Sequence, residues 1–291
     1  MTTPAPRAPA AGIVQPPWSA LFPADVQPII STIVGGAPFS RSCTPLPTAR
    51  TAVAFPVLDT ADPAWIAELD QIPDLGATQS SYEVAVSKLA GTILIAQESL
   101  DDSSYPITAE TEQILVDTFS HKLDKDLIGA AGPAPVPTGI LSVAAASNGA
   151  DLELATVQAK ADIGTAGGIA SHICLSPHFL GELEAARDTL GRALYPDAGT
   201  TFCGLNTVTA VGATQPFVFD RSRCWLVVRR DFVADFSNQT DSAWSHYAVS
   251  LRVIGRFALA IPQPNKAVRK LTVAGAAPVA SASEAKRGGK A

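Results

Sequence analysis

A long polar segment stands between two strand-like runs, and it restricts this chain more than any other feature. Residues 51–58 (TAVAFPVL) are predicted to form one strand and residues 81–96 (SYEVAVSKLAGTILIA) a longer one. The segment between them is polar, contains prolines, and is too long for a hairpin turn. Trp65 and Ile66 lie in its middle, where a merely disordered loop rarely needs such side chains. The segment therefore needs a partner surface.

Residues 108–128 are predicted to form a long helix that follows the second strand. Pro106 and Thr108 mark its start, and acidic residues in its first turn suit the helix dipole. Apolar side chains recur along it at spacings of three and four residues, at Val116, Phe119, Leu123 and Leu127. Gly129 is expected to end the helix.

A second region of mixed helices and strands follows. A helix is predicted over residues 152–163, and Ser176 before Pro177 predicts the capped start of another that runs to Gly191. Strands are predicted at 173–175, 207–211, 217–219, 225–229, 247–261 and 267–273. The pattern indicates an α+β protein, and 291 residues allow one large domain or two smaller ones.

The composition fits a chain with a sizeable core, because 47% of residues are hydrophobic and 16% are charged. A net charge of −6 gives no reason to expect tight nucleic-acid binding over the whole surface. No apolar run approaches a membrane span or a signal peptide, so we expect a soluble protein that is intracellular when made. The four scattered cysteines contain no C-x-x-C pair and are predicted to be reduced, mostly buried thiols.

No catalytic, cofactor-binding or metal site is predicted. The glycine-rich run 164–168 lacks the lysine of a phosphate-binding loop and follows a helix rather than a strand. His172, Cys174 and His178 are close in sequence but span a strand and the next helix, with no acidic partner nearby. The pair at 101–102 (Asp-Asp) lies where aspartates serve turns and caps.

Four segments, in this order, resemble the Hong Kong 97 fold of tailed-phage major capsid proteins. They are KLAGTILIAQESLDDSS (88–104), DKDLIGAAGPAPVPTGIL (124–141), LSPHFLGELEAARDTLGRALYP (175–196) and GRFALAIPQPNKAVRKL (255–271). The resemblance covers roughly residues 26–273 and implies an α+β capsid fold of that type.

The resemblance also implies how the chain is divided. Residues 1–25, rich in Pro and Ala, would form an N-terminal arm, and residues 275–291 a flexible, basic C-terminal tail. A peripheral P domain would comprise 26–134 and return at 223–274, and an axial A domain would span 135–222. The P domain would include an extended E-loop at 52–80 and a spine helix at 108–128.

Three surfaces are implied as contacts between subunits. The E-loop contact involves Trp65 and Ile66, and the loop at the capsomer axis involves Tyr195, Pro196 and Asp197. The contact near three-fold axes involves Phe236, Asn238 and Trp244.

The implied function is a shell subunit without enzymatic activity that assembles as hexamers and pentamers around a double-stranded DNA genome. Portal, scaffolding and cement proteins are the implied partners, DNA contact would be weak and non-specific, and no membrane is involved. Assembly would occur in the cytoplasm of the bacterial host and the product would reside in the virion capsid. Because only about 25 residues precede the fold, we expect scaffolding to be supplied in trans or to be unnecessary.

Some shells of this fold join an E-loop lysine to a neighbour's asparagine with the help of a glutamate. Residues 52–80 contain no lysine, and residues 223–264 contain no glutamate and a single asparagine, Asn238. A shell without covalent crosslinks is therefore expected.

Two alternatives remain at this stage. An encapsulin-type bacterial nanocompartment shell would share the fold, and neighbouring genes would distinguish it: a terminase and portal for a phage, a cargo enzyme for an encapsulin. An α/β enzyme of unrecognised type would need a nucleophile–base pair or a cofactor loop, and the sequence contains neither.

Overall fold

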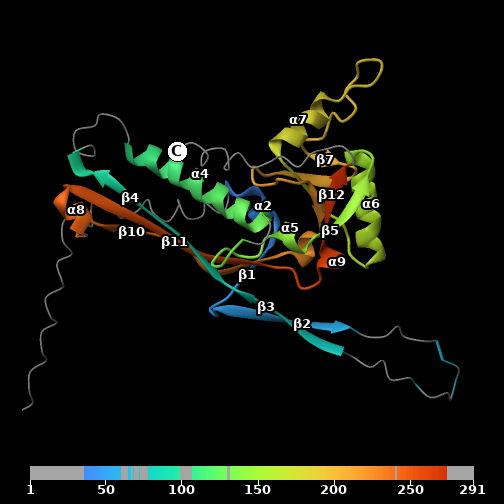
Figure 1. The fold of residues 1–291 in the computed structure, drawn as a ribbon, viewed down its shortest axis with the longest axis horizontal. Coiled ribbons are helices and arrows are strands. Elements are labelled where there is room, and N and C mark those ends of the chain that lie inside the picture. Colours follow the sequence, from blue (N-terminus) through green and yellow to red (C-terminus); the bar gives the residue numbers. More distant parts are fainter. Residues whose placement is uncertain are drawn as a thin grey trace, which may run out of the picture.

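The computed structural model describes residues 36–59, 65–66, 68, 72, 78–98, 107–129, 132–239 and 241–273. These residues form a mixed α+β fold with three sheets, and a narrow two-stranded ribbon projects from the rest (Figure 1). Helices and strands are named as in that figure.

The four-stranded sheet carries the long helix. Its strands, in spatial order, are β1 (Thr44–Pro47), β10 (Trp225–Ser237), β11 (Ala248–Ala260) and β4 (Ser87–Ala96). Helix α4 (Ile107–Ile128) lies against one face, and all four side chains of its predicted apolar stripe are buried. Phe119 of this stripe packs edge-on against Phe232 of β10, with ring centroids 5.5 Å apart. Gly91 of β4 lies beneath the Phe119 ring, where an added Cβ would come within 3.0 Å.

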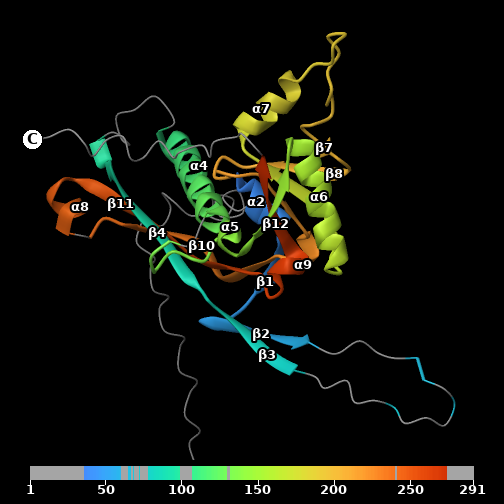
Figure 2. The same cartoon turned by 45° about the vertical axis from the view of Figure 1, so that its right-hand side comes forward.

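The six-stranded sheet is built from short strands of distant origin. In order they are β5 (Ala145–Gly149), β12 (Val268–Val273), β9 (Phe217–Phe219), β6 (His172–Leu175), β8 (Leu205–Thr209) and β7 (Thr201–Phe202). Helix α6 (Leu152–Thr165) packs on one face through Ala155, Ala159 and Ile163. Helix α7 (Pro177–Ala185) runs outward from this sheet, as Figure 2 shows, and its Leu183 is buried in the same cluster as these α6 side chains. The remaining short elements are α5 (Ile140–Val143), the 3-10 helix η2 (Arg221–Arg223), α8 (Asp241–Ser245) and α9 (Pro264–Ala267).

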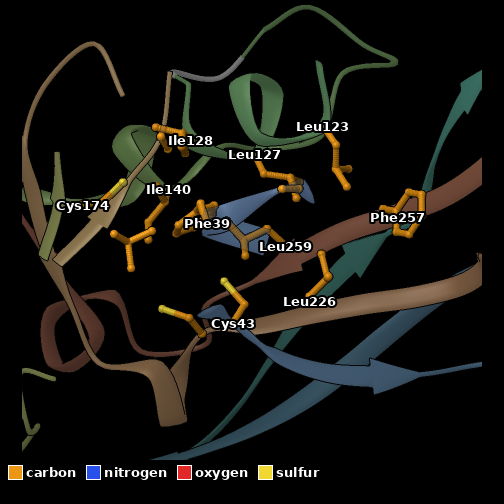
Figure 3. Close-up of a cluster of buried hydrophobic side chains, with 14 of the residues drawn as sticks. Phe39, Cys43, Leu123, Leu127, Ile128, Ile140, Cys174, Leu226, Phe257 and Leu259 are labelled. Atoms are coloured by element: carbon orange, nitrogen blue, oxygen red, sulfur yellow. The ribbon is translucent and has the colours of Figure 1, made fainter. Parts of the chain in front are cut away.

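The short helix α2 (Pro38–Ser42) lies between the two larger sheets. Its Phe39 is fully buried and contacts Phe217 and Phe219 edge-on, each at 5.6 Å. Figure 3 shows Phe39 among side chains from α4, α5 and β11, in a core cluster that both sheets share. Buried Asp124 of α4 accepts hydrogen bonds from the backbone N–H groups of Phe39 (2.9 Å) and Ser40 (3.0 Å). These contacts fix α2 to the long helix.

Strands β2 (Ala52–Asp59) and β3 (Thr78–Ala85) form the projecting ribbon. At its base, Val53, Phe55, Tyr82 and Val84 pack on Val227 and Ala258 of the four-stranded sheet. The predicted strand 81–96 is thus wrong as a single element, because it divides at Val86 between β3 and β4. Val86 N–H donates to Thr51 O at 2.9 Å, where the chain passes from the ribbon into the sheet.

Three other predicted boundaries are corrected. Helix α7 ends at Ala185 instead of Gly191, because Arg187 and Ala193 form the bridge of a small hairpin. Strand β10 continues beyond residue 229 to Ser237, with irregularities in register that interrupt the strict alternation. Tyr247 precedes β11, since its φ of +46° is not that of a strand.

Candidate intersubunit surfaces

The ribbon ends in a segment whose described side chains lie in solvent. Strands β2 and β3 pair over their whole length, from Ala52 with Ala85 to Asp59 with Thr78. Beyond that end, Trp65 is fully exposed (105%) and Ile66 is 40% exposed. A fully exposed tryptophan leaves a large apolar surface in water, as expected of a side chain that packs on a partner.

A hairpin between α7 and β7 forms a second projection. Asp188 N–H donates to Arg192 O at 2.8 Å, and Gly191 turns the chain with a φ of +77°. Leu190, at the turn, is 72% exposed, and Leu194 is exposed as well. Sequence reasoning missed both leucines, although the run DTLGRAL places apolar residues in a polar turn.

Tyr195 anchors the base of this hairpin. Its hydroxyl donates to Glu153 Oε2 of α6 at 2.5 Å, and its ring packs edge-on against Phe202 at 5.2 Å. The hydrogen bond to Glu153, together with burial, raises the pKa of Tyr195 to about 12. Pro196 and Asp197 follow and are exposed. Of the three predicted axis-loop residues, two are therefore in solvent and one holds the loop in place.

The third predicted surface lies at the far end of β10 and β11. Asn238 is exposed just after β10, and Trp244 of α8 is 80% exposed. Phe236 is a β10 residue opposite Leu251 of β11, and its side chain lies outside the described structure. The structure thus places Asn238 and Trp244 at one end of the long strands.

His172, Cys174 and His178, which are close in sequence, do not form a metal site. His172 is half-buried and stacks on Phe219 at 5.4 Å, and burial lowers its pKa. Cys174 is fully buried in the core, whereas His178 is exposed and faces Glu182 at 3.5 Å. Within the described residues, no three His, Cys, Asp or Glu side chains are grouped to hold a metal ion.

The glycine-rich run closes helix α6. Gly168 N–H donates to Ile163 O at 2.9 Å, and a Cβ on Gly168 would lie 2.0 Å from Lys266 O. The loop is therefore packed tightly against α9 rather than open as a phosphate cradle. Residues 101–102 and the basic tail lie outside the described residues.

The cysteine prediction is confirmed, since all four thiols are free, with Cys43, Cys174 and Cys224 buried and Cys203 half-buried. None of the described helices is both long and apolar enough to cross a membrane.

Comparison with known proteins gives one consistent result. The family model described as the phage capsid family matches residues 23–273. No curated protein matches the sequence significantly. A solved chain of Gordonia phage Cozz is similar with a TM-score of 0.68 and 17% identity, over 95% of this chain and 100% of that one.

Two further structures show the same likeness of fold. A chain of Mycobacterium phage Adephagia has a TM-score of 0.67 and 20% identity, over 85% of this chain and 91% of that one. The capsid of a native GTA particle has a TM-score of 0.65 and 15% identity, over 94% of this chain and 96% of that one.

Proposed function

The chain belongs to the phage capsid family, and on that premise we propose how this tailed-phage major capsid protein builds its shell. Membership of this family makes it a structural component of the virion capsid. We propose that subunits associate as hexamers and pentamers into an icosahedral shell around double-stranded DNA, without catalytic activity.

The projecting ribbon carries this proposal. Among the described side chains, those that pack at the ribbon's base come from its near half, and the ribbon leads to the exposed Trp65. A subunit that lends such an extension to a neighbour gains interface area, and stable interfaces bury on the order of 1,600 Å² in total. Residues 52–80 therefore act as the E-loop, with Trp65 and Ile66 as its anchors.

The other elements follow the same assignment. Residues 26–134 and 223–274 act as the P domain, with α4 as its spine helix, and residues 135–222 act as the A domain. Strand β12 joins the A-domain sheet from the returning segment, which ties the two domains together. The hairpin with Leu190 at its turn, followed by Tyr195, Pro196 and Asp197, faces the capsomer axis. Phe236, Asn238 and Trp244 contact neighbours near three-fold axes.

A matched pair of truncations tests the role of the ribbon. Burying a large aromatic side chain is worth a few kcal/mol at about 25 cal/mol per Å², so Trp65→Ala should yield folded subunits that assemble poorly. Ile66→Ala should weaken assembly too, whereas Ile169→Ala, at an exposed site outside the proposed contacts, should not. Particle yield is measured by sedimentation and electron microscopy. Normal particles at normal yield from Trp65→Ala would reject the assignment.

The shell is proposed to be non-covalent, because the E-loop contains no lysine. Mature particles boiled in detergent with reductant should run as one band near the monomer mass of 30.1 kDa. A ladder of capsomer-sized bands would contradict this.

Assembly is proposed to occur in the cytoplasm of a bacterial host. A portal protein, scaffolding supplied in trans and a cement protein are the proposed partners, and contact with packaged DNA is weak and non-specific. Particles purified from infected cells should contain DNA; particles that enclose a protein cargo instead would assign the chain to an encapsulin-type shell.

A further inference from the structure

Three basic side chains form a row across the four-stranded sheet. Lys88 of β4 lies opposite Arg256 of β11, and Arg256 lies opposite Arg230 of β10. Directly opposed residues of antiparallel strands project on the same face. The next residue of β11, Phe257, is buried in the core against Phe232, so the row lies on the other face, away from α4.

The row has no acidic partner within the described part of the chain. Like charges that face each other across strands destabilise a sheet, so such a row is costly in the free subunit. Within the described residues, no side-chain hydrogen bond or ion pair involves Lys88, Arg230 or Arg256. The nearby Asp231 accepts from Phe232 N–H at 2.8 Å, and Asp235 is paired with Arg252 at 2.9 Å.

An apolar row lies beside the basic one. Val233 of β10 pairs with Ile254 of β11, and Ile254 pairs with Ala90 of β4, next to the basic positions on the same face. Val233 and Ile254 are half-buried, and Ala90 is exposed. These two rows together are called the basic–apolar strip.

The segment beyond the ribbon has the opposite charge and the same apolar character. Between Arg50 and Lys88 the sequence contains no Lys, Arg or His. Its described apolar side chains Trp65, Ile66 and Ile72 are exposed. Five acidic residues fall within 59–74, at Asp59, Asp62, Glu68, Asp70 and Asp74.

The ribbon of one subunit leads away from its own strip. Asp59 and Thr78 lie four residues beyond Phe55 and Tyr82, the outermost side chains packed at the ribbon's base, which at about 3.3 Å per residue is roughly 13 Å. Figures 1 and 2 both show the ribbon running away from β10 and β11. The geometry therefore favours the strip of a second subunit as the surface that segment 59–74 contacts.

We propose that the basic–apolar strip of one subunit is the docking surface for the acidic segment 59–74 of a neighbouring subunit. The proposal rests on the proposed shell function and specifies which chemistry holds its ribbon contact. Repulsion along the strip in the free subunit becomes attraction on assembly. Screening by salt weakens this attraction, because the Debye length falls from about 10 Å at 0.1 M to about 3 Å at 1 M.

Charge reversal on each side tests the pairing. The strip variant Lys88→Glu/Arg230→Glu and the segment variant Glu68→Lys/Asp70→Lys should each raise the critical assembly concentration by up to about 25-fold at 0.1 M NaCl, since each of the two exposed pairs contributes up to roughly fivefold. The four substitutions together should restore assembly. Assembly is followed by light scattering and sedimentation across a salt series, in which the wild type should lose yield and the two reversal variants should lose little more.

A matched control reverses two charges outside the strip, with Lys125→Glu at an exposed position of α4 and Lys270→Glu on β12. It should assemble like the wild type. Thermal melting identifies any strip variant that is misfolded, in which case Lys88→Gln/Arg230→Gln is used in its place. Normal assembly by the strip variant, or no restoration in the combined variant, would overturn the proposal. The proposal would also be overturned if the strip variants assembled normally and lost only the binding of a duplex oligonucleotide. That result would make DNA the partner of the strip. In those cases shells still form and the capsid function stands, whereas a wild type that forms no shells would refute the function itself.

Discussion

Truncation of Phe39 to alanine should destabilise the subunit more than any other single change in α2. The side chain is fully buried where the two larger sheets meet, and its ring contacts both Phe217 and Phe219 edge-on. Removal leaves a cavity bordered by α4, α5 and β11, elements that are fixed by their own packing and that collapse only in part (Figure 3).

The expected cost follows from that geometry. Phe→Ala substitutions in protein cores cost about 3–5 kcal/mol, and the two edge-on ring contacts place Phe39 within that range rather than below it. For a chain of this size each kcal/mol lowers the melting temperature by roughly 2–4 °C, so a decrease of roughly 6–20 °C is expected.

Unfolding of unassembled subunits in urea and by heat measures the effect. The matched control is Phe55→Ala, which removes the same atoms from a half-buried ring at the ribbon base, where Trp225 lies 6.5 Å away. It should cost about 1 kcal/mol, because less apolar surface returns to water. If Phe39→Ala melted within 2 °C of the wild type (~1 kcal/mol or less), or no lower than Phe55→Ala, α2 would not be the joint between the sheets.

Three further predictions concern polar and sulfur-containing groups. Asp124→Ala should cost about 1–3 kcal/mol in denaturant unfolding, because it leaves buried backbone N–H groups without an acceptor; an unchanged midpoint would contradict this. Cys203→Asn should raise the melting temperature by roughly 2–4 °C, since Cys203 (φ +50°) and Gly204 (φ +76°) form the tight β7–β8 turn in which Asn-Gly is favoured, whereas Cys203→Ser should have no such effect. Burial raises the pKa of every cysteine, so at pH 8 a thiol reagent should modify the half-buried Cys203 first and reaction should quicken as pH rises; rapid modification of native subunits at other sites would refute the burial of Cys43, Cys174 and Cys224.

The elements that the sequence predicted are those whose signals are local or periodic in the sequence. Helix α4 lies within one residue of its expected start, because its apolar stripe and the glycine after it are both local signals. Ser176 caps α7 as expected, accepting from Phe179 N–H. The short elements α2, β1, α5 and β5 were missed, because they depend on partners far away in the chain. For α2 that partner is Asp124, 84 residues from Ser40.

Of the candidate surfaces, only those with a local sequence signal could be predicted. Trp65 could be recognised because a tryptophan stands out in a polar segment. The charge row of Lys88, Arg230 and Arg256 could not, because it exists only through the register of three strands that are far apart in sequence. The bulged course of β10, which no simple alternation reveals, decides which of its residues enters the row.

The position of β12 has a consequence for synthesis on the ribosome. This strand, C-terminal to every other described strand, inserts between β5 and β9 in the six-stranded sheet. Until residues 268–273 have left the exit tunnel, β5 has no described strand partner and β9 is the unpaired edge of the other four strands. The nascent chain therefore cannot complete this sheet in the order in which it is made, and long-range pairing of this kind is slow. We therefore expect a product truncated before residue 268 to leave the sheet incomplete and to be less able to enter a particle.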